Sequence, residues 1–249
     1  MFKSGNENII ANTLLGSPFA GTYTLTRSRR KTVVIYVRGG AVEVRAPLRM
    51  PEDEIDRFVA EKEEWILKIL AKQRIQVENK KSFAVNYGSF VTFRGNQYAI
   101  ASRSGLGFDG EFFCVPPDLT PQQIKAICIQ IYRRLAKEHI SNRVAAFAAQ
   151  MNAVPAVVKI NGAMKRWGSC SSKKSLNFSW RLIMADDSVI DYVVVHELAH
   201  LVEMNHSARF WAVVATVLPD YPARKLRLKE LQKKLANEDW ALQVFSARV

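Results

Sequence analysis

The chain has 249 residues, of which 48% are hydrophobic and 24% are charged, so it can bury a large core in one domain or in two smaller ones. No apolar run reaches the roughly 18 to 20 residues that a membrane-spanning helix needs. The start, residues 1–16, lacks the basic, apolar and cleavage segments of a signal peptide. We therefore expect a cytoplasmic protein with no membrane partner. Its three cysteines, Cys114, Cys128 and Cys170, form no close pair, which excludes a disulfide framework and a four-cysteine zinc site.

A formal net charge of +13 and a pI near 9.8 make the surface attractive to polyanions. Basic residues are frequent in Arg224–Leu235, a predicted helix whose leucines are expected to face inward. A solvated basic face is the simpler interpretation of this helix. Together with Arg27, Arg29, Arg30 and Lys31 it could instead form a track for a nucleic acid. Charge alone therefore leaves a nucleotide or a nucleic acid open as a partner, and the sequence does not set the oligomeric state.

Alternating residues predict a β-rich start to the chain. The runs Lys31–Val37 and Ala41–Ala46 alternate on either side of Gly39-Gly40, which predicts a β-hairpin. Apolar residues at helical spacing after Pro51 predict a helix. Further short strands are expected at Phe90–Phe93, Gln97–Ile100 and Phe112–Val115.

The pair Pro116-Pro117 marks the predicted boundary between two domains. Residues 1–117 are predicted to form a small β-rich α+β domain, and residues 118–249 the second domain. There, Thr120 with Gln123 three residues later is typical of a capping box, which predicts a long backing helix. Strands are expected at Val157–Ile160 and on both sides of a turn at Ser171–Ser175, and Ser188 with Asp191 predicts the start of another helix.

That helix leads into VVVHELAHLVEMNH, Val193–His206, which holds three of the four histidines. On an α-helix, residues four apart lie about 40° apart around the axis, so His196 and His200 can direct two imidazoles at one ion. Glu197 is too far around the helix to be a ligand and is placed to accept a proton from a metal-bound water. A buried helix with incidental histidines is the alternative, but it explains neither the third histidine nor the scarcity of histidine elsewhere. We therefore predict a zinc site with Glu197 as general base.

A catalytic zinc needs a third protein ligand, and two residues compete for that position. Glu203 stays on the same helical face if the helix continues beyond His200. His206 points about 280° away from His196 on a straight helix, so it joins the site only if the chain turns first. Asn205 offers that turn, because asparagine tolerates the left-handed conformation that ends many helices. We favour His206.

Residues before this helix are candidates for substrate binding. The predicted strand Asn177–Ile183 could pair with an extended substrate, with Asn177 and Trp180 in contact with it, although simple packing is an equal alternative for Trp180. Arg166 could donate to an oxyanion or a phosphate, although a solvated role is more usual. Trp211 is expected to pack behind His206 and to orient it.

Four segments in this half of the chain resemble the YgjP-like proteins, zinc metallopeptidases related to the SprT-like and small gluzincin-type zincins. The segments are WGSC at Trp167–Cys170, LNFSWRLIMA at Leu176–Ala185, IDYVVVHELAHL at Ile190–Leu201 and NHSARFW at Asn205–Trp211. The early TRSRRKTVVIYVRGGAVEVRAP is similar to the front domain of that family, and the likeness extends from about Tyr23 to Leu235.

The resemblance implies a zincin-like catalytic domain made of a backing helix, a small sheet, the HExxH helix and a C-terminal helix. It also implies zinc on His196, His200 and His206, with Glu197 as the catalytic acid and base. The turn glycine of the related metzincin pattern is replaced here by Glu203, so the path from His200 to His206 need not follow theirs.

We therefore predict a zinc-dependent hydrolase that cleaves peptides or proteins. One alternative is a metal-dependent nucleoside triphosphate pyrophosphohydrolase, suggested by the basic balance and by Arg166, Lys173 and Lys174 near the expected site. Another is a nucleic-acid-associated SprT-like protein in which the zinc is structural.

Overall fold

The computed structural model describes residues 10–13 and 22–242 and divides the chain into two compact units, Met1–Ser82 and Phe83–Val249. The prediction that residues 1–16 hold no signal peptide falls mostly on positions outside the described residues. Within the described ranges, every helix is too short or too polar to cross a lipid bilayer.

The division between the units lies at Ser82, before the Pro116-Pro117 pair that the sequence suggested as the boundary. The reason is that the strands before the two prolines belong to the same hydrophobic core as the helix after them. Phe113, for example, packs on Tyr132 with ring centroids 5.2 Å apart. The two prolines therefore lie in a loop within the second unit.

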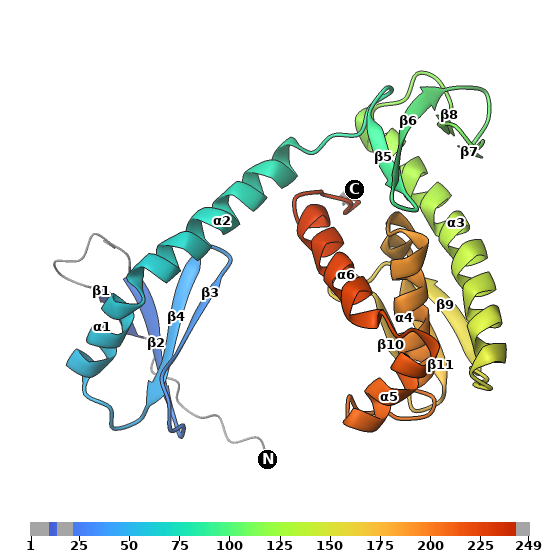
Figure 1. Cartoon of the computed structure of the whole chain (residues 1–249). Helices are drawn as coiled ribbons and strands as arrows, with labels where there is room; N and C mark the ends of the chain where they lie inside the picture. Colours follow the sequence, from blue (N-terminus) through green and yellow to red (C-terminus); the bar gives the residue numbers. More distant parts are fainter. Residues whose placement is uncertain (1–9, 14–21, 243–249) are drawn as a thin grey trace, which may run out of the picture. The chain divides into compact units, whose positions relative to one another are not determined.

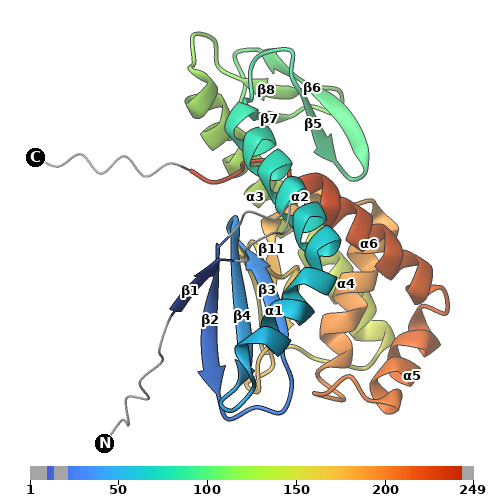
Figure 2. The same cartoon turned by 90° about the vertical axis from the view of Figure 1, so that its left-hand side faces the viewer.

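The first unit is a four-stranded sheet with two helices (Figure 1). Its elements are β1 (Ile10–Thr13), β2 (Thr22–Ser28), β3 (Val34–Arg38), β4 (Ala41–Pro47), α1 (Glu52–Glu61) and α2 (Glu63–Ser82). The strand order is β1-β2-β4-β3, which Figure 2 shows side by side. The predicted hairpin is confirmed as β3 and β4, with Gly39 and Gly40 both at positive φ. Apolar residues of β4, including Val44, pack with Ile55 of α1 and Ile66 of α2.

The second unit contains the predicted backing helix, small sheet, histidine helix and C-terminal helix. Its elements are β5 (Phe90–Phe93), β6 (Asn96–Ser102), β7 (Gly107–Phe108), β8 (Phe113–Val115), α3 (Pro121–Gln150), β9 (Val157–Asn161), β10 (Gly168–Cys170), β11 (Ser175–Ser179), the 3-10 helix η1 (Trp180–Met184), α4 (Asp187–Ala199), α5 (Ala208–Val217) and α6 (Tyr221–Leu235). The mixed α+β class predicted from the sequence is therefore confirmed.

The backing helix α3 begins as the sequence predicted. Thr120 Oγ1 accepts a hydrogen bond from the Gln123 amide, and the Thr120 amide donates to Gln123 Oε1 at 2.8 Å. Both bonds satisfy amide hydrogens that a helix start leaves without partners. Behind this cap, α3 buries a stripe that includes Ile124, Ile131 and Ile140, so it forms one wall of the core.

The small sheet has the order β10-β11-β9, with β11 in the centre. It pairs antiparallel with β10 and parallel with β9. The predicted strand over Asn177–Ile183 is wrong in its second half, because the chain leaves the sheet after Ser179 and enters η1. Both edges of β11 are used by its neighbours, so β10 carries the free edge on the α4 side.

Helix α4 lies between α3 and α6 (Figure 1). Its cap is Asp186, whose Oδ1 accepts from the Val189 amide at 3.2 Å, rather than the predicted Ser188. Ser188 instead donates its hydroxyl to the same carboxylate. The Asp186 carboxylate is stabilised at the N-cap because its negative charge lies at the positive end of the helix dipole.

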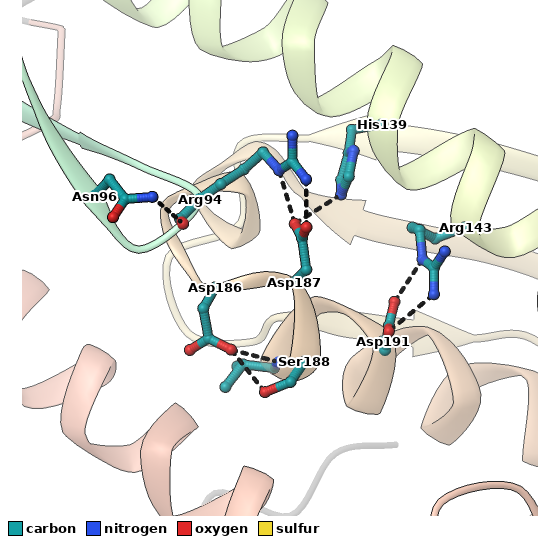
Figure 3. Close-up of polar contacts among 9 residues, drawn as sticks. Arg94, Asn96, His139, Arg143, Asp186, Asp187, Ser188 and Asp191 are labelled. Carbon is teal, nitrogen blue, oxygen red and sulfur yellow. Dashed lines mark hydrogen bonds and ion pairs between the residues drawn. The ribbon is translucent and has the colours of Figure 1, made fainter.

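Ion pairs fix the orientation of α4 against its neighbours (Figure 3). Arg94, at the tip of the β5–β6 turn, and His139 of α3 both point at Asp187 in its first turn. Arg143 of α3 makes a two-pronged contact with Asp191, at 2.6 and 2.8 Å. The start of the histidine helix is therefore held from both sides before its functional residues are reached.

We expect Arg143→Met to destabilise the second unit by about 2 kcal/mol, since Asp191 would keep a poorly solvated carboxylate without its partner. Arg209→Met is the matched control, because Arg209 is 77% exposed and 3.9 Å from Glu203, and a pair of that kind contributes less than about 0.5 kcal/mol. Urea unfolding of both variants measures the difference. Equal free energies of unfolding would show that the Arg143 contact does not stabilise α4.

Candidate metal centre

The HExxH residues lie at the end of α4, and the chain turns directly after them. His196 and Glu197 are in the last helical turn, and His200 is the C-cap. The amides of Leu201 and Val202 donate three residues back, to Leu198 and Ala199, which tightens the turn and ends the helix.

The predicted role of Asn205 in this turn is wrong. Asn205 is not among the residues with positive φ in the described part of the chain. Its side-chain oxygen instead accepts from the Ser207 amide at 3.0 Å, just before Ser207 caps α5. Asn205 therefore directs the entry into α5, and the preceding residues make the turn that redirects the chain toward His206.

The turn brings three imidazoles together. One ring nitrogen from each of His196, His200 and His206 lies within 4.8 Å of the others. The Nε2 atoms of His196 and His206 are 3.0 Å apart. Three convergent imidazoles are the donor set that zinc prefers at a catalytic site with an open fourth position, so these residues fit a bound zinc ion.

Two aromatic side chains of α5 support the three rings. Phe210 is fully buried, and its ring centroid lies between 4.6 and 4.9 Å from all three imidazole centroids. Trp211 stacks on His206, as the sequence predicted, and on Tyr221 of α6. The rings are therefore held by packing as well as by any bound ion.

A hydrogen bond from its ring to the backbone orients His200. Its Nδ1 lies 3.1 Å from the carbonyl oxygen of Glu203, which leaves Nε2 free as a ligand atom. The Glu203 carboxylate is outside the cluster and lies 3.9 Å from Arg209. Glu203 thus contributes its backbone carbonyl to the site, whereas its side chain points to a different partner.

Burial keeps His196 and His200 neutral. It lowers the pKa of His196 to about 3, assisted by the neighbouring His200 and His206 and by the charge of Lys225. Burial also lowers the pKa of His200. A neutral imidazole keeps the lone pair that binds a metal, so both rings are available as ligands at physiological pH.

Glu197 is the buried carboxylate beside this cluster. It is only 5% exposed, and its Oε2 has no hydrogen-bond partner among the residues that the structure describes. Burial raises its pKa to about 7, although the charge of Arg166 acts against that rise. A carboxylate with a pKa near 7 exchanges a proton readily at neutral pH, which suits a general base that later acts as an acid.

The space that holds Glu197 exists because residue 168 is glycine. A Cβ atom added at Gly168 would lie 2.5 Å from Glu197 Oε1 and 2.6 Å from its Cγ. Strand β10 therefore approaches α4 more closely than it could with any residue other than glycine at position 168. Gly168 stands in the WGSC segment, where no local pattern predicts a role for it, and only the packing of β10 on α4 explains it.

Two pockets meet at Glu197. One, of about 300 Å³, lies over the histidine cluster and is lined by Gly168, Ser169, Cys170, His196, Glu197, His200, Met204 and His206. The other, of about 180 Å³, is lined by Trp167, Gly168, Tyr192, Val193, His196, Glu197 and Leu228. Because both share Gly168, His196 and Glu197, a molecule positioned at the carboxylate can reach both pockets.

The predicted substrate residues occupy different places. Arg166 is exposed and close enough for its charge to act on Glu197. Asn177 lies in the central strand β11, paired with Ser169 of β10. Trp180 is 2% exposed and stacks on Tyr132, so we correct its assignment: it is a core residue and cannot contact a substrate.

Strand β10 offers the backbone groups that β11 does not. The Ser179 amide donates to the Trp167 carbonyl, and the Ser171 amide donates to the Ser175 carbonyl. Trp167 and Ser171 therefore direct their backbone groups toward β11, and every second residue between them does the same. In an antiparallel pair the residues that alternate with these direct their N–H and C=O groups away from the partner. Gly168 and Cys170 therefore present their backbone groups along the free edge, beside Glu197.

Three convergent imidazoles with a buried carboxylate beside them define a metallohydrolase type of site. A family model described as YgjP-like, metallopeptidase domain matches residues 31–231. The chain therefore belongs to the YgjP-like family, and the resemblance seen in the sequence is confirmed.

Comparisons with individual proteins add little detail. No curated protein matches the chain. Among solved structures, the chain is similar to the metallopeptidase zymogen abylysin of Pyrococcus abyssi, with 20% identity, a TM-score of 0.35 and coverage of 40% of this chain and 97% of that one. It is also similar to the zymogen jannalysin of Methanocaldococcus jannaschii, with 22% identity, a TM-score of 0.34 and coverage of 38% and 96%.

The raised pKa of Glu197 predicts a pH-dependent stability of the metal-free protein. Its folded-state pKa of about 7 exceeds the ordinary 4.5, so the folded protein binds more protons and loses stability as the pH rises through that window. The free energy of unfolding of metal-free Glu197→Gln should therefore be higher than that of the wild type by up to about 3 kcal/mol at pH 8. At pH 4 the two free energies should be equal. Urea unfolding in EDTA measures this, and a difference independent of pH would contradict it.

A double-mutant cycle tests the contact between Gly168 and Glu197. We expect Gly168→Ala to cost about 1 to 3 kcal/mol of stability, because the added methyl overlaps the carboxylate. In a Glu197→Ala background the same substitution should cost much less, since the overlap is gone. Additive effects in the unfolding free energies would mean that the two residues do not compete for space.

Proposed function

We propose that the second unit is a zinc-dependent metallopeptidase in which His196, His200 and His206 hold the ion and Glu197 is the general base. The observation that carries this proposal is the convergence of three imidazoles beside a buried carboxylate. Membership of a family defined by a metallopeptidase domain supports the same chemistry.

When bound, zinc would polarise the scissile carbonyl and lower the pKa of a water molecule at the site. Glu197 accepts the proton of that water at its unpartnered Oε2 and then delivers it to the nitrogen of the leaving amine. In the metal-free protein, burial raises the pKa of this carboxyl to about 7, and the same burial leaves Oε2 close to the site where the water is activated.

The free edge of β10 is the proposed binding strand for the peptide. The N–H and C=O groups of Gly168 and Cys170 can pair with an extended backbone, in the mode of strand addition. This replaces the central strand β11, whose two edges are already paired. Arg166, exposed at the start of this edge, remains the candidate donor to a developing oxyanion.

The contacts of α6 weigh against a nucleic-acid role for its basic residues. Four of them are engaged within the unit: Arg224 bonds Asp220, Lys225 lies over Trp211, Arg227 pairs with Asp186, and Lys234 donates to Thr92. The prediction that all its leucines face inward is also wrong, since Leu226 is 58% exposed. Most of this basic face therefore stabilises the fold.

The thiols support a reducing compartment, which we propose to be the cytoplasm. Cys114, Cys128 and Cys170 are all unpaired in the described part of the chain. Two of them are buried, where disulfide formation with another molecule is blocked.

Substitution of Glu197 tests the proposal. In zinc-loaded protein, Glu197→Gln should keep one zinc per chain and lower kcat/KM on peptides by about 10³-fold, the scale of a lost general base. His206→Ala should lose zinc affinity, whereas Glu203→Gln, the rival ligand, should keep both zinc and activity. Metal analysis and an unbiased peptide screen measure these outcomes.

A parallel screen of nucleoside triphosphates gives the contradicting result. Release of pyrophosphate or phosphate that disappears in Glu197→Gln, with no peptide cleavage, would assign the site to the nucleotide alternative. Loss of zinc in Glu203→Gln with retention in His206→Ala would replace His206 by Glu203 as the third ligand.

A further inference from the structure

The smaller of the two pockets at Glu197 differs in character from the one over the histidines. We call it the Trp167 pocket, after one of the aromatic residues that line it. Its volume is about 180 Å³. It is formed between strand β10, helix α4 and helix α6, and it shares Gly168, His196 and Glu197 with the larger pocket over the histidine cluster.

The walls of the Trp167 pocket are mostly apolar. Trp167 and Tyr192 are aromatic, and Val193 and Leu228 are aliphatic. Tyr192 and Val193 are buried in the core of the unit, and Leu228 packs against that core from α6. Burial raises the pKa of Tyr192 to about 12, so its hydroxyl stays neutral.

Besides the Tyr192 hydroxyl and the Trp167 indole N–H, the polar side chains in the wall are Glu197 and His196, and both belong to the proposed reaction centre. A negatively charged ligand group would meet the Glu197 carboxylate there, with no basic residue in the lining to offset it. A positively charged group would have to pair with Glu197 itself, which the proposed reaction needs for proton transfer. The pocket therefore suits an uncharged, apolar group.

The size of the pocket matches a large side chain. A cavity of about 150 Å³ lined by apolar residues is enough to bind benzene in a well-studied case. A pocket of about 180 Å³ can thus accept a phenyl ring or a branched aliphatic side chain. A glycine or alanine side chain would leave most of it empty.

The edge of β10 aims a substrate at this pocket. The Cβ direction of Gly168 points at Glu197. In a β-sheet, a residue paired directly with Gly168 would project its own side chain to the same face. A peptide on the free edge therefore carries a side chain toward α4, directly beside the carboxylate that serves the scissile bond.

We propose that the Trp167 pocket selects peptides with an aromatic or large aliphatic side chain on a residue that flanks the scissile bond. This inference rests on the proposed peptidase function and names its substrate class. Leu228, which closes the pocket from α6, is the specificity-determining residue most open to substitution, because it lies outside the zinc and proton-transfer groups.

The experiment compares peptides that differ only at the two positions flanking the cleaved bond. Zinc-loaded wild type should cleave the Phe and Leu peptides with kcat/KM about 100-fold above the Ala and Asp peptides, the scale of a filled against an empty apolar pocket. Leu228→Trp should fill the pocket and remove most of that preference while it retains cleavage of the Ala peptide. Leu226→Trp, on the exposed face of the same helix, should behave like wild type.

A binding measurement separates this inference from the proposed function. Zinc-loaded Glu197→Gln should bind the Phe peptide more tightly than the Ala peptide, and the added Leu228→Trp should abolish the difference. Circular dichroism and zinc content show whether each variant is folded. If Leu228→Trp does not fold, Leu228→Ala replaces it and tests the pocket by enlarging it.

Each outcome has one meaning. Glu197-dependent cleavage without a preference at either flanking position, or a preference that neither Leu228 variant changes, would overturn the pocket assignment and leave the peptidase function standing. Absence of cleavage of every peptide would overturn the proposed function. In that case, equal binding of the Phe and Ala peptides would overturn the pocket assignment as well.

Discussion

The close approach of strand β10 to helix α4 is the constraint on which the site depends. Glu197 occupies a volume that any side chain at position 168 would fill, so the carboxylate is buried beneath a backbone strand rather than exposed on a helix. That burial raises its pKa to about 7. The same approach places the free backbone groups of Gly168 and Cys170 beside it. One missing Cβ atom thus connects the protonation of the base with the strand proposed to bind the peptide.

The remainder of the second unit holds α4 in the position that this approach requires. Ion pairs from Arg94 and Arg143, with a polar contact from His139, act on its first turns. The aromatic residues Phe210 and Trp211 pack on the imidazoles at its end. Contacts at both ends reduce the freedom of the helix to shift. Catalytic groups must be held to a fraction of an ångström, and this arrangement supplies that rigidity before a metal binds.

Much of the positive charge is used to build the fold. Arg224, Arg227 and Lys234 of α6 bind groups at the start of α4 or in β5. A high net charge measured from composition gives no information on which cations have partners. For this unit the folded contacts reduce the case for a polyanion track, and the apolar walls beside Glu197 support a peptide side chain instead.

Local features of this protein could be predicted from its sequence, whereas contacts between distant segments are visible only in the folded structure. The i, i+4 spacing of His196 and His200 and the capping box at Thr120 follow from helix geometry, which acts over a few residues. The turn that redirects His206 toward the cluster was predicted to depend on Asn205, but backbone bonds before it make that turn. The unit boundary, the burial of Trp180 and the edge position of β10 depend on which distant segments pack together. No local pattern encodes such packing, because the partners of Gly168 and Trp180 lie far from them along the chain.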